Sequence, residues 1–330
     1  MYIKQTRNWK YVRKKSKCRS FVFTFPPVLF TKKRSQDMET LDTPNFIIAG
    51  ASKAGTGWLR QCLIEHPDVY IPEGPTIDYF SRNFGKERSW YLSHFRAARN
   101  RQRVGEKSTS YIISKNVPER IYKLDPDIDL YFVLRDPIQR AYSHYKMLLR
   151  AGKVSKNVDD VLSKDSSLVK EGLYNKNINR FSEHFDNENI YIFFFEDLVQ
   201  NNRKFVKNVF ASLGVRNDFL PSIIDSKYNT TKSLPKYSTL YPVLVSIIRF
   251  ARKKSATFND LVRYSRKKGY TSRFHNLIGS KDFPKISVKR WKTLKSLYEK
   301  DILRLQDRTG KDLGDWCDQP DGRIVRGCDQ

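Results

Sequence analysis

Residues 45–59 read Asn-Phe-Ile-Ile-Ala-Gly-Ala-Ser-Lys-Ala-Gly-Thr-Gly-Trp-Leu: an apolar run, a glycine-rich turn and the start of an apolar-periodic segment. This order predicts a buried strand, a loop and the first turns of a helix. Glycines let the backbone come close to an anion, and the free N–H groups at a helix N-terminus bind it. The stretch therefore predicts an anion-binding loop at the end of a strand.

The loop departs from the nucleotide-triphosphate P-loop, Gly-x-x-x-x-Gly-Lys-Ser/Thr, at the position of its lysine. Thr56 follows Gly55 where that lysine belongs, and the cation is instead Lys53, inside the loop. A lysine between two loop glycines predicts a contact with the bound anion rather than a solvated side chain. The displacement argues against a nucleotide or small-molecule kinase.

A second motif follows another apolar run, residues 130–134. Arg135 stands at the predicted end of that strand, Pro137 fixes the chain near a helix start, and Ser143 lies about two turns into the helix. A guanidinium fork and a hydroxyl suit phosphate oxygens. Arg135 could instead pair with Asp136 or a surface carboxylate, but its place one strand after the glycine-rich loop favours an anion site. It also stands where a kinase would need a magnesium-binding aspartate.

The apolar pattern predicts the fold class. Three apolar runs, at 46–49, 130–134 and 190–195, are typical of buried parallel strands, and helical periodicity separates them. Apolar residues from 288 to 305 recur every three to four residues and predict a long helix, with Gly310 as its C-terminal cap. We expect an α/β fold of three layers around a mostly parallel sheet, with ligands at the carboxyl ends of the strands. Residues 227–286 are basic and predict helices with long loops.

The amino-acid composition limits the kinds of ligand and partner that the chain is expected to bind. Lys and Arg number 62 against 35 Asp and Glu in 330 residues, a formal charge of +27 that predicts an anionic partner. No zinc-finger, RNP-like or homeodomain pattern is present, so we expect no specific nucleic acid. The four cysteines form no C-x-x-C pair, and the five histidines show no ligand spacing. We expect no metal.

The two ends of the chain are expected to be tails. Residues 1–43 are basic, and their apolar stretch, residues 21–30, is too short to span a bilayer and contains Pro26 and Pro27. They predict a mobile tail or a peripheral contact with an anionic membrane surface. We expect one domain over 44–320, a C-terminal tail over 321–330, and a cytoplasmic protein that is either free or peripheral at a membrane.

Five segments, in this order, resemble sulfotransferases that use 3'-phosphoadenosine 5'-phosphosulfate (PAPS), particularly the carbohydrate, heparan-sulfate-like branch and related bacterial enzymes. They read Ala-Ser-Lys-Ala-Gly-Thr-Gly-Trp-Leu at 51–59, Gly-Glu-Lys-Ser-Thr-Ser-Tyr at 105–111, Leu-Arg-Asp-Pro at 134–137 with Arg-Ala-Tyr-Ser at 140–143, Phe-Glu-Asp-Leu at 195–198, and Thr-Gly-Lys-Asp-Leu-Gly-Asp-Trp at 309–316.

The resemblance implies a cofactor, an acceptor and their ligands. Lys53 and its loop would cradle the 5'-phosphosulfate of PAPS, and Arg135 and Ser143 would hold the 3'-phosphate, also in the product 3'-phosphoadenosine 5'-phosphate (PAP). The loop set is Ser52, Lys53, Ala54, Gly55, Thr56, Gly57 and Trp58. The acceptor would be a hydroxyl or amine of a saccharide or glycoconjugate, with an acidic polysaccharide fitting the charge. A sulfuryl group carries less negative charge than a phosphoryl group, so its transfer needs no magnesium clamp of the kind ATP requires.

The catalytic base is where the sequence departs from similar carbohydrate sulfotransferases. Their glutamate position holds Thr76, and their histidine position holds Asp78. Asp78 is the first candidate to replace the base, ahead of Glu73 and Glu106, and Lys107 is expected to touch substrate or sulfuryl oxygens. Glu106 equally fits a structural acceptor. The missing glutamate leaves open a third possibility, a non-catalytic polyanion-binding protein on the same fold.

Overall fold

The computed structural model describes residues 43–99, 101–225, 234–235, 280–318 and 322–326. The expected basic tail therefore lies outside the described residues except for its last position. Most of the basic region 227–286 lies outside them too.

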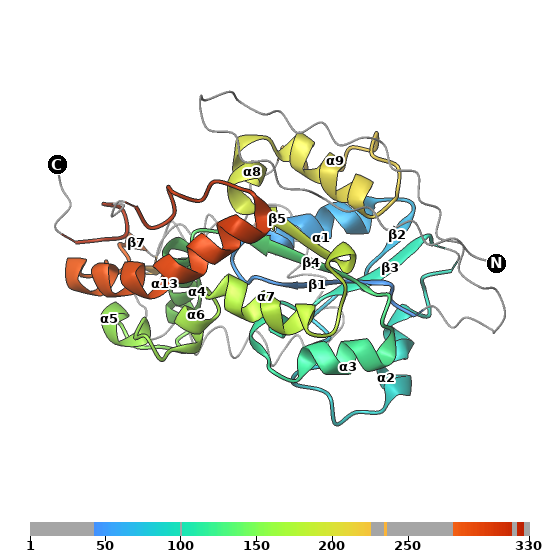
Figure 1. Ribbon diagram of the computed structural model, residues 1–330, viewed down its shortest axis with the longest axis horizontal. Coiled ribbons are helices and arrows are strands. Elements are labelled where there is room, and N and C mark those ends of the chain that lie inside the picture. The colour runs from blue at the N-terminus through green and yellow to red at the C-terminus, as the bar shows by residue number, and fades with distance from the viewer. Residues whose placement is uncertain (1–42, 100, 226–233, 236–279, 319–321, 327–330) are drawn as a thin grey trace, which may run out of the picture. The chain divides into compact units, whose positions relative to one another are not determined.

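The chain alternates strands and helices around a five-stranded sheet (Figure 1). The strands are β1 (Phe46–Gly50), β2 (Val69–Tyr70), β3 (Arg103–Lys107), β4 (Asp129–Leu134) and β5 (Ile190–Phe194), with a separate pair β6 (Leu234–Pro235) and β7 (Ser280–Lys281). The α-helices are α1 (Thr56–Glu65), α2 (Arg88–Leu92), α3 (Val117–Leu124), α4 (Pro137–Arg150), α5 (Val158–Val161), α6 (Ser167–Lys170), α7 (Tyr174–Ser182), α8 (Phe195–Gln200), α9 (Asn202–Ser212) and α13 (Val288–Thr309). Short 3₁₀ turns are η1 (Ser93–Phe95), η2 (Tyr111–Ile113) and η3 (Asn187–Asn189).

The sheet is parallel throughout, in the order β2-β3-β1-β4-β5. β1 lies between β3 and β4, so the loops that leave these three strands meet at one edge of the sheet. The chain leaves β1 toward β2 on one side and later leaves β3 for β4 on the other side. Ligands of open parallel sheets bind where the strand order reverses in this way.

Helices cover both faces of the sheet, as a three-layer fold requires. α1, α8 and α9 lie on one face and α3 and α7 on the other (Figure 1). On the first face the ring of Phe193 packs edge-on against Phe205 of α9, with centroids 5.7 Å apart. On the second, Phe132 packs against Phe181 of α7 at 5.1 Å. The predicted three-layer α/β class is confirmed.

The three predicted strands are present, and each begins and ends within one residue of its predicted bounds. β5 stops at Phe194, because Phe195 already begins α8. β2 and β3 were not expected, and β3 has only one branched apolar residue, Val104. Gly105 is required in it, since a Cβ there would lie 2.5 Å from the ring of Phe46. The close approach of β3 to β1 depends on that glycine.

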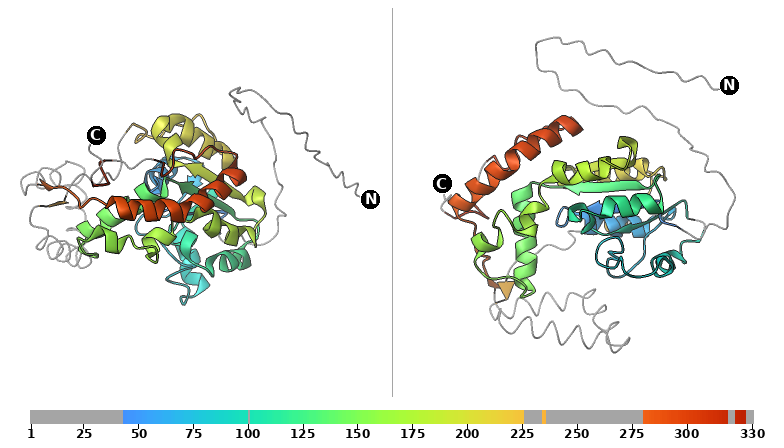
Figure 2. Two further views of the ribbon diagram at one scale, coloured as in Figure 1. Left: turned by 60° about the vertical axis from the view of Figure 1, so that its left-hand side comes forward. Right: turned by 60° about the horizontal axis from the view of Figure 1, so that its bottom comes forward.

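The long C-terminal helix is present as α13, beside α4 and α7 (Figure 1 and the left view of Figure 2). Ser287 caps its start by accepting a hydrogen bond from the N–H of Arg290, and Gly310 ends it in a left-handed conformation with φ 66°. The Asp301 carboxylate accepts bonds from the N–H groups of Asn175 and Lys176, both 2.9 Å. α13 thereby fixes the start of α7.

Candidate active site

The glycine-rich loop joins β1 to α1 as the sequence predicts. Gly55 precedes the first helical residue with φ 89°, and a Cβ there would lie 2.6 Å from Leu198 Cδ2. Lys53 also has a positive φ of 69°. Within the described residues, the backbone N–H groups of Lys53, Ala54 and Gly55 donate to no backbone or side-chain acceptor. Such a turn of unpaired N–H groups at a helix N-terminus suits an oxyanion.

The buried carboxylate of Glu171 anchors the glycine-rich loop through a hydrogen bond. Glu171 accepts a 2.7 Å hydrogen bond from the N–H of Ser52 and lies 3.1 Å from Nη1 of the fully buried Arg140. Nδ1 of His144 is 3.6 Å from the same carboxylate. Burial alone would raise the pKa of Glu171, but Arg140 and His144 outweigh it and lower the pKa. The carboxylate of Glu171 therefore stays charged. The N–H of Ser52, the first of the loop, is hydrogen-bonded to this side chain.

Arg135 lies against the loop, directly after β4. Its Nη1 donates to the carbonyl of Lys53 (3.4 Å), and its Nη2 donates to Oε1 of Gln139 (3.1 Å). The guanidinium stacks 4.5 Å above the ring of Phe195, and its buried Nε has no hydrogen-bond partner in the described part of the chain. Burial lowers the pKa of Arg135, and the nearby Asp136 opposes that shift. Arg135 is therefore held in position while one of its N–H donors, at Nε, stays unpaired.

Two lysines converge on the same edge. The pKa of Lys53 is lowered by burial and then by the charges of Arg135 and Lys146. The pKa of Lys107, at the end of β3, is lowered by burial and by Arg60 and Lys53, while Asp78 raises it. Like charges held together in this way leave a local excess of positive potential. An anionic ligand would relieve it.

Asp78 lies close enough to Lys107 to raise its pKa, and its carboxyl group is held in place by hydrogen bonds. Thr76 Oγ1 donates to Oδ2 (2.9 Å) and Ser110 Oγ donates to Oδ1 (2.6 Å). The residue is 8% exposed and adopts a left-handed φ of 50°. A nitrogen of Arg82 lies 3.8 Å from Oδ2. The carboxyl group is therefore fixed in position while a small part of the residue stays exposed.

Glu106 lies deeper, 1% exposed. Its Oε1 accepts from the hydroxyls of Tyr91 (3.0 Å) and Tyr111 (2.9 Å), and its Oε2 accepts from Ser108 Oγ (2.8 Å). Ser108 Oγ in turn accepts from the N–H of Asp78 (3.0 Å). Burial raises the pKa of Glu106 to about 7. The carboxyl thus supports Asp78 through Ser108.

The other predicted residues occupy the elements expected of them. Thr56, Gly57 and Trp58 form the first turn of α1, Ser143 lies in α4, and Glu73 is exposed in the loop after β2. Ser52 Oγ donates to Thr109 Oγ1 (3.0 Å), so the loop is joined to the segment after β3.

Several supporting residues were not predicted. Glu171 and Tyr91 belong to no motif, and Ser108 and Tyr111 lie in the 105–111 segment without a role assigned from the sequence; the fold brings all four to the site. In the residues that the structure describes, no three His, Cys, Asp or Glu side chains group as metal ligands would, and no helix is long and apolar enough to cross a bilayer.

Comparison with known proteins places this geometry in a family. Residues 43–316 match the family model of the sulfotransferase domain. Human heparan sulfate glucosamine 3-O-sulfotransferase 5 is 32% identical over 164 residues, which are 45% of this chain and 47% of that protein. Human heparan sulfate glucosamine 3-O-sulfotransferase 3B1 is 28% identical over 206 residues, 58% of this chain and 51% of that protein. The chain spans about half the length of these curated relatives.

A solved structure supports the fold independently. The crystal structure of a sulfotransferase from Alicyclobacillus acidocaldarius superposes with a TM-score of 0.60 at 22% identity, covering 83% of this chain and 98% of that one. At this identity the likeness shows a shared fold. The family model, however, covers most of the sequence, from just before β1 to Trp316. The chain therefore belongs to the sulfotransferase domain family.

Proposed function

We propose that residues 44–320 form one catalytic domain that transfers a sulfuryl group from PAPS to a hydroxyl or amine of a saccharide or glycoconjugate. Membership of the family supports the reaction class. The names of two relatives describe heparan sulfate glucosamine as their substrate, and this supports a saccharide acceptor here. The formal charge of +27 favours an acidic one.

The observation that carries the proposal is the loop between β1 and α1, with unpaired N–H groups beside Lys53. These groups fit the phosphosulfate end of the donor, whose sulfuryl group the reaction consumes. Arg135, with its unpartnered Nε, and Ser143 fit the 3'-phosphate at the other end. The contact between Arg135 and the carbonyl of Lys53 couples the two ends. The adjoining residues Ser52, Thr56, Gly57 and Trp58 complete the cradle.

The lysines supply electrostatic stabilisation. In an in-line displacement, negative charge develops on the bridging oxygen of the leaving nucleotide, and a cation already fixed there lowers the barrier. Lys53 is held in this role by the loop backbone. Lys107, one strand away, neutralises the oxygens of the transferred group. Because burial lowers the pKa of both lysines, their charges are poorly hydrated and act strongly on an anion.

Asp78 is the proposed base. Its carboxyl group is fixed by Thr76 and Ser110 near Lys107 and keeps a small exposed fraction, so it can accept the proton of an incoming hydroxyl. Glu106 is too enclosed to touch an acceptor, and we assign it to positioning Asp78 through Ser108.

The test begins with the donor. Calorimetry of the full chain with PAP and with magnesium–ATP should show binding of PAP and much weaker binding of ATP. A transfer assay with radiolabelled PAPS and a panel of saccharides should then show label on an acceptor, lost in Lys53→Ala. ATP hydrolysis without PAP binding would favour a kinase. PAP binding with no transfer to any acceptor would favour a polyanion-binding protein.

A further inference from the structure

Residues 171–174, which join α6 to α7 and which we call the support segment, contact both ends of the proposed donor site. At one end, the buried carboxylate of Glu171 accepts a hydrogen bond from the N–H of Ser52 in the glycine-rich loop (2.7 Å). At the other end, the hydroxyl of Tyr174 donates to the backbone carbonyl of Arg135 (2.7 Å). One short stretch of chain therefore joins the loop after β1 to the arginine after β4.

The support segment is itself held by two helices. On the side of α4, Nη1 of the fully buried Arg140 lies 3.1 Å from the Glu171 carboxylate. On the side of α13, the hydroxyl of Tyr298 donates to the carbonyl of Val169 (2.9 Å), just before the segment, and Asp301 accepts the first two N–H groups after it. The segment therefore cannot shift without disturbing its contacts with α4 and α13.

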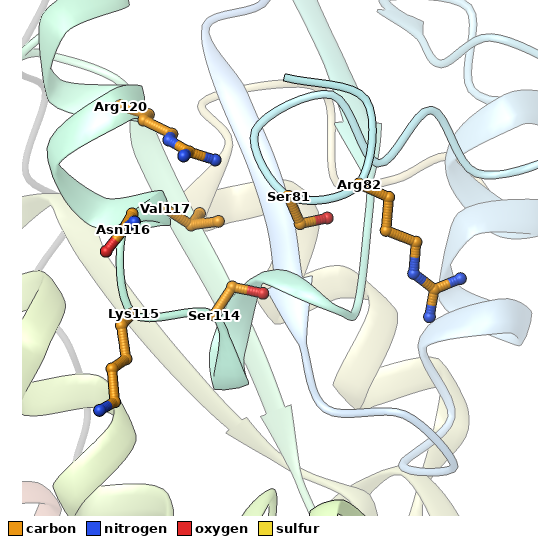
Figure 3. A pocket seen from close by; sticks show the side chains of 7 residues that line it. All are labelled: Ser81, Arg82, Ser114, Lys115, Asn116, Val117 and Arg120. Carbon is orange, nitrogen blue, oxygen red and sulfur yellow. The ribbon is translucent and has the colours of Figure 1, made fainter. Parts of the chain in front are cut away.

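The support segment acts on backbone groups of the donor site. Ser52 is held twice, because its N–H is bonded to the segment and its hydroxyl to Thr109. The N–H groups of residues 53–55, which come next, have no acceptor within the described residues and stay available to an anion. Residues 171–174 do not line the open cavity of about 430 Å³ beside the loop after Asp78, which Figure 3 shows. Their contacts are with the loop and with Arg135.

We propose that Glu171 and Tyr174 are positioning residues for sulfuryl transfer, which together set the spacing between the loop that holds the 5'-phosphosulfate and the guanidinium that holds the 3'-phosphate. The inference rests on the proposed function and goes beyond it, because neither side chain touches the donor. Glu171 acts through the N–H of Ser52, and Tyr174 acts through the carbonyl of Arg135. A spacing fixed before binding lowers the cost of ordering the site around a nucleotide that carries both groups.

The loop end is tested with Glu171→Ala. Its control is Asp129→Ala, which removes a carboxylate paired with Arg103 at the start of β4, the end opposite the donor site. Calorimetry of the full chain uses PAP, adenosine 5'-phosphate and adenosine 3'-phosphate. We expect Glu171→Ala to bind PAP and adenosine 5'-phosphate roughly 10- to 150-fold more weakly, the change that corresponds to one hydrogen bond to a charged group. Its affinity for adenosine 3'-phosphate should stay at the wild-type value, and Glu171→Gln, which keeps an oxygen for the N–H, should restore part of the lost affinity.

The arginine end is tested with Tyr174→Phe, which removes a single oxygen. The matched control is Tyr145→Phe, because that buried hydroxyl also donates to a backbone carbonyl, the one of Lys156 (2.9 Å). We expect Tyr174→Phe to weaken PAP and adenosine 3'-phosphate roughly 2- to 12-fold, the change that corresponds to one neutral hydrogen bond. Adenosine 5'-phosphate should bind as it does to wild type. Urea unfolding of each variant shows that the affinities are compared between folded chains.

End-specific losses in the two site variants, with wild-type affinities in the two controls, support the positioning roles. Unchanged PAP affinity in Tyr174→Phe, equal loss in the controls, or equal weakening of both monophosphates by each site variant overturns them. If the monophosphates bind too weakly to titrate, the PAP affinities decide, and if Glu171→Ala does not fold, Tyr174→Phe decides. A wild type that binds no PAP overturns the proposed function together with this inference, whereas PAP binding that neither site variant alters overturns the inference alone.

Discussion

Replacing Glu106 by glutamine should remove one definite component of the pH dependence of stability. The side chain is enclosed by Tyr91, Tyr111 and Ser108, and glutamine keeps its size and an oxygen for the two tyrosine hydroxyls. The substitution removes the titratable proton of Glu106, because glutamine does not titrate. The difference in unfolding free energy between the wild type and the variant therefore isolates this one carboxyl.

The magnitude follows from the pKa of Glu106. Burial raises it from 4.5 to about 7, against the opposing hydrogen bonds from Ser108, Tyr111 and Tyr91. Between these two values the folded chain holds a proton that the unfolded chain has released. Rising pH therefore destabilises the wild type relative to the variant by about 1.4 kcal/mol per pH unit, or roughly 3 kcal/mol in all. The stabilising proton is fully present below pH 4.5 and its effect is lost by the time the pH passes 7.

The assay is urea unfolding of both proteins, checked for reversibility, at intervals from about pH 5 to pH 8. Other buried carboxyls, such as Asp136 and Asp301, titrate in both proteins and cancel in the difference. We expect the difference to fall steadily up to about pH 7 and to be flat above it. A difference that does not vary with pH, or that rises with pH, would refute the description of Glu106 as a buried, proton-holding carboxyl. Transfer activity that survives Glu106→Gln at neutral pH would support a positioning role.

Further substitutions test the rest of the site. Lys53→Met should lower kcat for sulfuryl transfer roughly 100- to 1,000-fold, the range for removing one preorganised electrostatic donor, with unchanged thermal unfolding. Asp78→Asn should lower kcat at least 100-fold while PAP affinity, measured by calorimetry, changes little. Gly55→Ala should abolish PAP binding and cost about 1–3 kcal/mol of stability because of its positive φ and crowded Cβ, whereas Gly85→Ala, with open space around it, should be silent in both measurements. Asp136→Ala should destabilise the start of α4 by about 0.5–2 kcal/mol in urea unfolding.

The sequence predicted the parts of the fold that carry continuous apolar runs. β1, β4 and β5 are such runs, and all three lie in the middle or at one side of a sheet covered on both faces. β3 was missed because its residues, Arg103–Lys107, are mostly polar or glycine. Its burial comes from its neighbours in the sheet, which a local pattern does not contain.

The candidate site likewise contains residues that the sequence could predict and residues that it could not. Lys53 and Arg135 could be placed because each follows a recognisable strand, and parallel strands bring their carboxyl ends to one edge. Glu171 could not, since it supports the loop across 119 residues of sequence, and nothing near it in the chain indicates that role. Asp78 was chosen by its position in a motif. Its fixed carboxylate depends on Thr76 and on Ser110, which lies 32 residues further on.

The N-terminus of α4, which follows Arg135, is hydrogen-bonded to a residue far along the chain. Asp136 Oδ1 caps α4 through the N–H of Gln139, and Oδ2 accepts from the N–H of Cys317, 181 residues later. During synthesis at about 5–20 residues per second, every strand of the main sheet leaves the ribosome first, and this last contact forms roughly 10–40 s after Asp136 has been made. A nascent chain thus lacks this contact at the edge where we propose that PAPS binds, and a premature stop before residue 317 would leave the start of α4 without it.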